Sequence, residues 1–274
     1  MDFSRYRDRH RRAPRRGFQR SLASSLMGLA AGCLGLAPPA HADNPGYDRP
    51  GYGFTPAVLG AGEVTFEQGL PDWNRTDQGG VASSQYSADS LLRIGLGGPL
   101  ELQLGSSPWN RLRQSGSGGN YRRQGRGDSV LGMKFALPSD GGSFSWGLLG
   151  SVEFPDGARA FRADGRQYLL GAQFNLQVDP RNSLGAYLQD VRSGGADSAT
   201  LALSDSYALG KTLTLYGEAV WLHAPGQGNG SLGGAGLAWL VTPRVQLDAG
   251  FDHRLGGTAA QWQGNLGVSV YFGH

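Results

Sequence analysis

The chain has little cysteine, little charge and no long capped helix. Cys33 is its single cysteine among 274 residues, which excludes a disulfide scaffold and a cysteine-based zinc cluster. Charged residues make up 17% and hydrophobic residues 39%, a balance that argues against a highly charged disordered chain. Glycine is abundant, with 46 residues, but no G-x-y repeat marks a collagen helix. Beyond residue 42 no segment shows a sustained helical period with caps.

Residues 1–42 are typical of an export signal. Eight arginines precede an apolar stretch, Leu22–Leu36, and a small-x-small cleavage site follows at Ala40–Ala42. We therefore predict a cleaved signal peptide, because the apolar stretch is short and rich in Gly and Ser for a membrane span. A retained anchor, acylation at Cys33 and a twin-arginine signal at Arg15-Arg16 remain alternatives.

Removal of the leader changes the charge of the protein. The leader holds eight of the 25 basic residues and two of the 22 acidic ones, so 17 basic and 20 acidic residues remain, a net charge of −3. The basic pI of about 9.1 is thus mostly a property of the leader. Nucleic-acid binding loses its compositional support, and no nucleic-acid-binding motif replaces it.

The mature chain alternates apolar and polar residues with period two, which is the pattern of half-buried β-strands. In Gln167–Val178, for example, Leu170, Phe174 and Leu176 fall on one face and Gln173 and Asn175 on the other. Twelve such segments are predicted: Ala61–Gly69, Ser90–Leu96, Leu100–Gly105, Ser129–Leu137, Phe144–Phe154, Gln167–Val178, Ser183–Val191, Thr200–Leu209, Thr212–His223, Ser231–Val241, Val245–Asp252 and Trp262–Phe272.

The connections between these strands alternate in length. Five are short: Gly97–Pro99, Pro138–Gly142, Asp179–Asn182, Gly210-Lys211 and Thr242–Arg244. Six are mostly longer and more polar: Leu70–Asp89, Ser106–Asp128, Pro155–Arg166, Arg192–Ala199, Ala224–Gly230 and His253–Gln261. Short turns at one end and long loops at the other are typical of an outer-membrane β-barrel, with both termini on the periplasmic side.

The sequence thus predicts an all-β protein, a transmembrane antiparallel up-and-down β-barrel of about 12 strands in the cell outer membrane. The predicted parts are a signal peptide (1–42), an irregular periplasmic N-terminal segment (43–60) and the barrel (61–272). Whether residues 43–57 plug the lumen or hang in the periplasm stays open. A secreted soluble barrel or sandwich is the alternative, but the strands are long for a sandwich. The last strand ends at Phe272, which resembles the terminal aromatic that outer-membrane assembly machinery recognises.

If the apolar side chains face lipid, the polar ones line the lumen. The selectivity candidates are charged: Arg93, Glu101, Lys134, Glu153, Glu218 and Asp248. The wider set adds Glu63, Glu67, Gln103, Gln173, Asn175, Gln189, Gln246, Asn265 and Tyr271. We expect Arg93 and Lys134 to neutralise the glutamates, because charges away from bulk water are costly unless paired. The set either forms a structural polar core or a constriction that selects permeants.

An arginine-rich segment falls in the second long connection. It contains Arg111, Arg113, Arg122, Arg123 and Arg126 and is predicted to be an extracellular basic loop. Guanidinium forks match phosphate geometry, so this loop is expected to contact lipopolysaccharide and outer-membrane lipid, or to capture an anionic solute.

Catalysis, metals and cofactors find no support in the sequence. The mature histidines His223, His253 and His274 are in no arrangement with serine that a barrel hydrolase needs. No phosphate-binding or calcium-loop pattern is present either. We therefore predict a protein that is not an enzyme and has no catalytic residues, metal or cofactor.

Two regions resemble a known family. Arg49–Leu59 (RPGYGFTPAVL) with Glu67–Asp72 (EQGLPD), and Val245–Gly250 (VQLDAG) with Gly267–Phe272 (GVSVYF), are similar to the ends of the "putative meta-pathway of phenol degradation" family. The resemblance implies an outer-membrane transporter or channel of Gram-negative bacteria. The expected function is a passive or gated path, or a binding site, for small solutes such as aromatic or apolar compounds. A structural barrel with a plugged lumen is the alternative, and a lipid hydrolase the least favoured.

Overall fold

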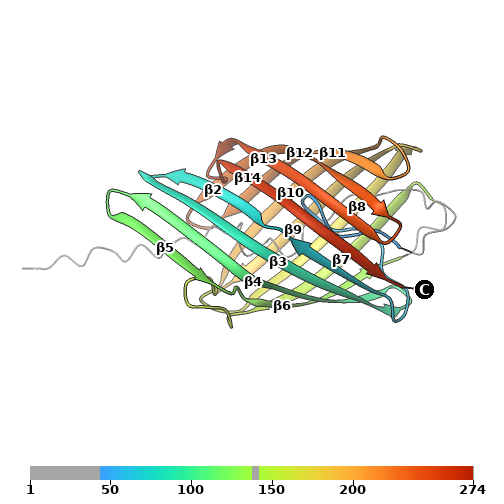
Figure 1. Ribbon diagram of the computed structural model, residues 1–274, viewed down its shortest axis with the longest axis horizontal. Helices are drawn as coiled ribbons and strands as arrows, with labels where there is room; N and C mark the ends of the chain where they lie inside the picture. The colour runs from blue at the N-terminus through green and yellow to red at the C-terminus, as the bar shows by residue number, and fades with distance from the viewer. Residues whose placement is uncertain (1–43, 138–141, 274) are drawn as a thin grey trace, which may run out of the picture.

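The computed structural model describes residues 44–137 and 142–273, and the elements in these two ranges are all β-strands (Figure 1). The predicted signal peptide lies outside the described residues. The strands are β1 (Val64–Gly69), β2 (Asp72–Gln78), β3 (Val81–Gly97), β4 (Leu100–Gly116), β5 (Gly119–Gly125), β6 (Ser129–Ala136), β7 (Phe144–Phe154), β8 (Gln167–Asp179), β9 (Asn182–Ser193), β10 (Ala196–Ala208), β11 (Leu213–Ala224), β12 (Gly228–Thr242), β13 (Val245–Gly257) and β14 (Trp262–Phe272).

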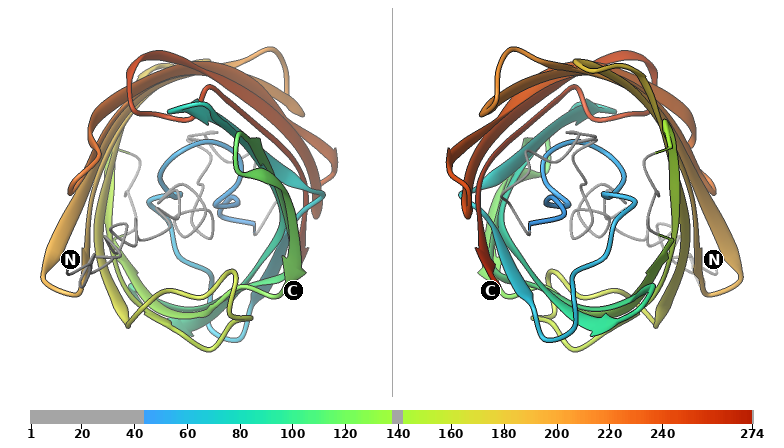
Figure 2. Two further views of the ribbon diagram at one scale, coloured as in Figure 1. Left: turned by 90° about the vertical axis from the view of Figure 1, so that its left-hand side faces the viewer. Right: turned by 90° about the vertical axis from the view of Figure 1, so that its right-hand side faces the viewer.

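The strands close into a barrel. Each pairs antiparallel with its neighbours, and β1 closes the ring on β14, with Val64 opposite Phe272 and Gly69 opposite Gly267. Twelve strands form the wall: β1, β3, β4 and β6 to β14. Figure 2 shows this ring from both ends. The predicted twelve-stranded up-and-down barrel is confirmed.

The two further strands prolong strands of the wall. β2 pairs with β3 and β14, as β1 does, after a break at Leu70-Pro71. β6 and β5 both pair with β4, one after the other along its length. The register is the same for both, since Ser106 of β4 opposes Ser129 of β6 and Asn110 of β4 opposes Gly125 of β5. The hairpins β2–β3 and β4–β5 therefore extend the sheet past the rest of the wall. We call this four-stranded sheet the extension.

The prediction of long loops is accordingly wrong at most places. Leu70–Asp89 and Ser106–Asp128 are mostly strands of the extension. The strands β9, β10, β12 and β13 run into the expected loops Arg192–Ala199, Ala224–Gly230 and His253–Gln261. Two glycines with left-handed φ, Gly194 at 60° and Gly195 at 86°, make a two-residue turn between β9 and β10. Pro155–Arg166 is the connection that stays without a strand. Strands beyond the bilayer meet water on both faces, so they lose the alternation that makes a strand recognisable.

The opposite end of the barrel has the short turns. The strands β3–β4, β8–β9 and β12–β13 are joined by two residues each, as the sequence predicts. The turn expected at Pro138–Gly142 lies mostly outside the described residues. β1 begins and β14 ends at this end, which makes it the periplasmic end of an outer-membrane barrel.

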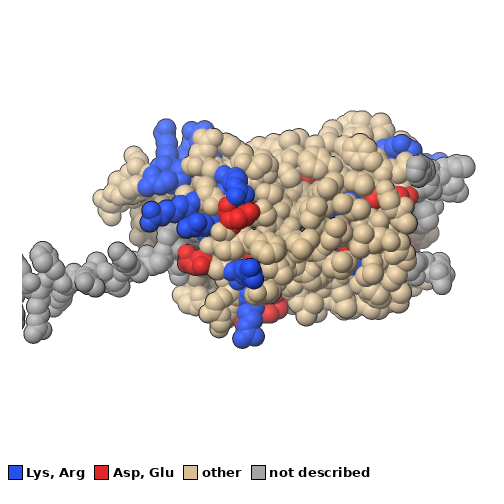
Figure 3. Space-filling model, turned by 90° about the horizontal axis from the view of Figure 1, so that it is seen from below, with Lys and Arg blue, Asp and Glu red and all other residues tan. Residues whose placement is uncertain are grey.

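Apolar side chains cover the outside of the wall. Leu170 is 64% exposed and Leu266 53%, whereas Arg93 and Lys134 are fully buried in the interior. Aromatic residues such as Tyr168, Trp221 and Trp239 are also exposed, as in the girdles of membrane barrels. Figure 3 shows most charged side chains toward the ends, with a surface between them in which only small charged patches are visible. In the described ranges, no helix is long and apolar enough to span a bilayer.

The segment before β1 lies inside the barrel, which decides between the two placements that the sequence leaves open. Residues 44–60, the plug segment, form neither helix nor strand and pass through the ring of strands (Figure 2). Tyr47, Phe54 and Leu59 of this segment are buried against the wall. The segment is irregular, as predicted, but its predicted periplasmic placement (43–60) is wrong for residues 44–60, because their side chains pack on the wall and bond to it inside the barrel.

Candidate functional site: a plugged lumen with a cavity above the plug

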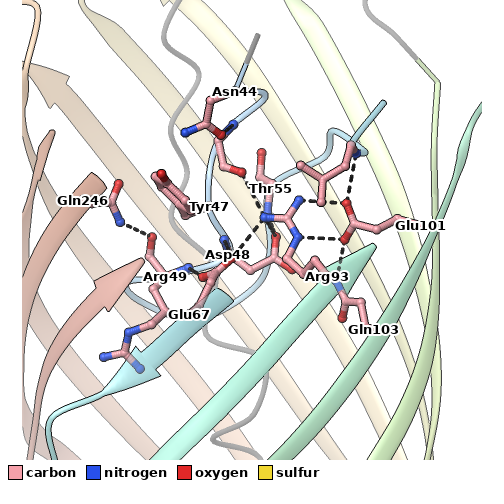
Figure 4. Close-up of polar contacts among 12 residues, drawn as sticks. Asn44, Tyr47, Asp48, Arg49, Thr55, Glu67, Arg93, Glu101, Gln103 and Gln246 are labelled. Carbon is pink, nitrogen blue, oxygen red and sulfur yellow. Dashed lines mark hydrogen bonds and ion pairs between the residues drawn. The ribbon is translucent and has the colours of Figure 1, made fainter. Parts of the chain in front are cut away.

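Asp48 of the plug segment is the centre of a buried charge network (Figure 4). Its carboxylate accepts hydrogen bonds from the Lys134 ammonium at 3.1 Å, the Gln103 amide at 2.8 Å and the backbone N–H of Thr55 at 3.0 Å. The Arg93 guanidinium lies 3.5 Å from the same carboxylate. Asp48 thus joins the plug segment to strands β3, β4 and β6.

The wall supplies the rest of this network. Arg93 Nε lies 2.8 Å from Glu101 Oε1, and Lys134 Nζ lies 3.0 Å from the same atom. Arg93 Nη1 reaches Glu67 Oε1 at 3.1 Å. All five charged side chains, Asp48 included, are completely buried at their charged ends. Two cations therefore face three carboxylates with hydrogen bonds to each, which is how buried charges become tolerable.

A second anchor lies on the other side of the plug segment. Arg49 binds Asp72 with both terminal nitrogens, at 2.9 and 3.1 Å, and its Nη2 lies 3.2 Å from Asp248. The backbone N–H groups of Asp48 and Arg49 both donate to Glu67 at 2.9 Å, and Gln246 donates to the Arg49 carbonyl at 2.9 Å. The plug segment is therefore bonded to β1, β2 and β13.

Glycine makes room for the plug segment at two positions on the wall. A Cβ on Gly95 of β3 would collide with the backbone carbonyls of Leu59 and Gly60. A Cβ on Gly267 of β14 would collide with the Arg49 guanidinium. The wall is thus shaped for this segment, because a larger residue at either position would push it away.

A cavity of about 190 Å³ lies above the plug segment and extends to the extracellular ends of the strands. Gly51, Tyr52 and Gly53 of the plug segment form its floor, and Tyr187 and Leu222 contribute apolar wall. The ring of Phe54 meets that of Tyr187 edge-on at 5.9 Å, which fixes the floor against β9. The cavity therefore combines apolar and aromatic surface with an extracellular opening and a closed lower end.

Two carboxylates line this cavity without a basic partner in the described part of the chain. Glu218 accepts the backbone N–H of Tyr52 at 3.0 Å, and Asp252 Oδ1 has no hydrogen-bond partner. Both are buried, and they repel each other electrostatically. The upper lumen is thus an acidic environment, in contrast to the neutralised network below.

The structure brings together only some of the predicted lumen residues. Arg93, Glu101 and Lys134 share one network, but their other partners are Glu67 and Asp48 instead of the expected Glu153 and Glu218. Glu153 is half-buried near the extracellular end of β7, opposite Gln167. Asp248 pairs with Arg49. The remaining lumen candidates are Glu63, Gln103, Gln173, Asn175, Gln189, Gln246, Asn265 and Tyr271, all of them buried or half-buried.

Sequence reasoning missed Asp48, Arg49 and Asp72 as site residues. Asp48 and Arg49 lie between Pro45 and Pro50 in a stretch without periodicity, so no strand face assigned them a side. The feature of the sequence that could have indicated them is an adjacent acid and base beside aromatic residues, in a segment expected to be irregular. Asp72 falls in a predicted loop, and its place at the start of β2 follows from the pairing of β2 with β3 and β14.

The predicted basic loop is folded into strands. Arg111 and Arg113 lie on β4, and Arg122 and Arg123 on β5, all at the extracellular end. Arg126 pairs with Asp156 across 3.6 Å in a half-exposed contact. Slight burial favours the neutral acid, but the N–H and hydroxyl of Ser129 and the Arg126 guanidinium outweigh it and hold the pKa of Asp156 below its ordinary value.

Comparison with known proteins defines the class. Residues 47–272 match the family described as "Putative MetA-pathway of phenol degradation", and the chain belongs to it. The fold is similar to the crystal structure of the COG4313 outer membrane channel from Pseudomonas putida F1 (TM-score 0.55, 16% identity, 79% of this chain and 97% of that one). It is also similar to the KdgM porin (TM-score 0.51, 9% identity, 77% and 99%). No curated protein sequence matches the chain.

Proposed function

We propose that this outer-membrane barrel is a gated path for small solutes, closed in this structure by the plug segment. The observation that carries the proposal is the buried network between Asp48 and the wall residues Arg93 and Lys134. These contacts are non-covalent, and breaking them leaves the segment without its main anchor in the lumen. Similar folds include a protein described as an outer membrane channel and one described as a porin, which supports the same reading.

The cavity supports a class of solute. Its apolar and aromatic surface, from Tyr52, Tyr187 and Leu222, suits a small aromatic or apolar compound. Its size, about 190 Å³, is that of a small molecule and not of a polymer. A solute would enter from the extracellular end and bind in the cavity above the plug segment until that segment moves.

We further infer that the barrel has outer-membrane partners and no catalytic role. Lipid and lipopolysaccharide surround the wall, and assembly machinery reads the last strand, which ends with Phe272 exposed on the outside. The described histidines have non-catalytic surroundings: His223 is bonded to Asn229, and His253 packs on Trp262 with ring centres 4.0 Å apart. No described residue beside these two rings is arranged with them as a nucleophile with its base.

Conductance of the reconstituted barrel tests the gate. Asp48→Asn removes the charge that holds the plug segment to Arg93 and Lys134, so we expect its mean conductance in planar bilayers to exceed that of the wild type by about tenfold or more. That factor corresponds to about 1.4 kcal/mol of closing free energy, less than the cost of about 3–5 kcal/mol for removing one partner of a buried ion pair. Asp205→Asn, an exposed change on β10, is the matched control and should leave conductance unchanged.

The same measurement distinguishes a path from a permanently plugged structural barrel. If wild type and Asp48→Asn both pass no ions, and liposomes containing either protein take up no small aromatic solute, the gated path is wrong and the structural role takes its place.

A further inference from the structure

The outer wall of the extension carries a row of arginines. Arg75 of β2, Arg113 of β4 and Arg122 of β5 occupy successive opposed positions, with Ser84 of β3 between the first two. Residues directly opposite each other in a sheet share one face. Asp72 and Asn74 of β2 are buried toward the lumen, so the odd-numbered Arg75 faces away from it. The row therefore faces the surroundings of the barrel.

These arginines are not paired with an acid, although Asp77 of β2 lies in the next row of the same face, opposite Ala82. All three are exposed, and none forms an ion pair with a described residue, whereas Arg126 nearby is paired with Asp156. Arg113 and Arg122 are direct cross-strand neighbours, a like-charge arrangement that destabilises a sheet. An anion bound between the two guanidinium groups would remove that penalty and supply charge-assisted hydrogen bonds.

The row borders a hollow that such an anion could occupy. The hollow measures about 290 Å³ and is bordered by Arg75, Arg113 and Arg122. The floor of the hollow is formed by small side chains, those of Ala82, Ser84 and Ser115. Ala82 opposes Ser115 in the next row of the same face. Long cationic side chains around a shallow floor give several guanidinium forks access to one phosphate group.

The position of the hollow identifies the source of the phosphate. One row nearer the barrel, Trp73 and Tyr86 stack with ring centres 6.4 Å apart, opposite each other on the same outward face. Aromatic rings of this kind mark the membrane–water interface, and the apolar wall follows below them. The arginine row therefore stands at the headgroup level of the extracellular leaflet. Figure 3 shows basic side chains gathered at this end of the barrel.

We propose that this hollow binds a phosphate of the lipid A part of lipopolysaccharide. The lipid would pack its acyl chains along the apolar wall and place its phosphate between Arg75, Arg113 and Arg122. The proposal depends on the outer-membrane placement of the barrel and not on the solute path, so a barrel that conducts nothing would still bind the lipid.

Binding of purified lipid A to the full barrel in detergent, measured by calorimetry, tests the site. The triple variant Arg75→Gln, Arg113→Gln, Arg122→Gln should bind lipid A at least about tenfold more weakly than the wild type, because each charged hydrogen bond contributes more than 1 kcal/mol. The control Arg123→Gln, Arg126→Gln, Arg162→Gln removes the same charge at the same end of the barrel and should change the affinity less than about threefold.

Two further ligands identify what is bound. Dephosphorylated lipid A should bind the wild type at least about tenfold more weakly than lipid A, and inorganic phosphate should bind more weakly still, since it lacks the acyl chains. Equal weakening by both triple variants, or equal binding of lipid A with and without phosphate, would overturn the proposal. Inorganic phosphate bound as tightly as lipid A would also overturn it, in favour of a site for a free anion.

Folding of each variant is checked by the heat-dependent shift of barrel mobility in gels. Should the triple variant fail to fold, the single changes Arg122→Gln and Arg123→Gln form the matched pair, because these adjacent residues of β5 face opposite sides of the sheet. The first should weaken lipid A binding, and the second should not. Equal affinities in this pair would contradict the site as directly as equal triple variants.

Discussion

The lower and upper halves of the lumen handle charge in opposite ways. In the lower half, Asp48, Glu67 and Glu101 share two cations and several amide donors, and the plug segment fills the remaining space. In the upper half, Glu218 and Asp252 border a cavity with no basic partner among the described residues. The lower half is thus built to hold a segment of the chain in place, and the upper half to receive something from outside.

Stability separates the two halves most strongly. Arg93→Gln leaves three buried carboxylates with only Lys134, so we expect the free energy of unfolding to fall by about 3–5 kcal/mol. Glu218→Gln replaces a carboxyl group that has no cation to pair with, and we expect a change below about 1 kcal/mol. Guanidinium unfolding in detergent, followed by tryptophan fluorescence, measures both. Equal losses would mean that the upper carboxylate is as structural as the lower network.

The next largest effect concerns the contact between the plug segment and the wall. Gly95→Ala should cost about 1–3 kcal/mol and displace the plug segment, because its Cβ would overlap the backbone of Leu59 and Gly60. Gly150→Ala is the control: its Cβ would meet no atom within 4 Å, and its φ is not left-handed. Protease cleavage between residues 44 and 60 should therefore accelerate in the first variant only. Unchanged cleavage in Gly95→Ala would show that the segment is not held by this contact.

The smallest expected effect is on ion selectivity. In the Asp48→Asn background, the carboxylates of Glu218 and Asp252 should favour cations over anions. Neutralising both with Glu218→Gln and Asp252→Asn should bring the cation-to-anion permeability ratio toward unity by a factor of about two to five. The reversal potential in a salt gradient measures this ratio. Glu153→Gln, a half-buried carboxylate on β7, serves as control, and a shift as large in this control would remove Glu218 and Asp252 from the path.

Much of the fold could be predicted from local patterns. Gln167–Val178 shows why: each strand alternates sides on its own, so its lipid face and lumen face are visible without knowledge of its neighbours. The extension escaped prediction for the same reason. Residues 72–78 and 119–125 have polar side chains on both faces, and only their pairing with β3, β14 and β4 makes them strands.

The candidate site was predictable in part. Arg93, Glu101 and Lys134 sit on polar faces of clear strands, and their burial follows from that alternation. Their main partner Asp48 could not be found, because its segment has no period and contacts Lys134 across 86 residues of sequence. Glu153 was wrongly expected in the charge network, because its position along the barrel axis depends on strand register, which the sequence does not show.

The sequence by itself determined that the wall is a sheet whose strands each have one apolar and one polar face, because the period of two is a local property of each strand. Only the tertiary structure decided what fills the interior and which charges meet there. Those contacts join Arg49 to Asp248 across 199 residues, and their geometry depends on ring closure and on the path of a segment that carries no repeating pattern. Buried charges need partners within a few ångströms, and only the assembled barrel places them so closely.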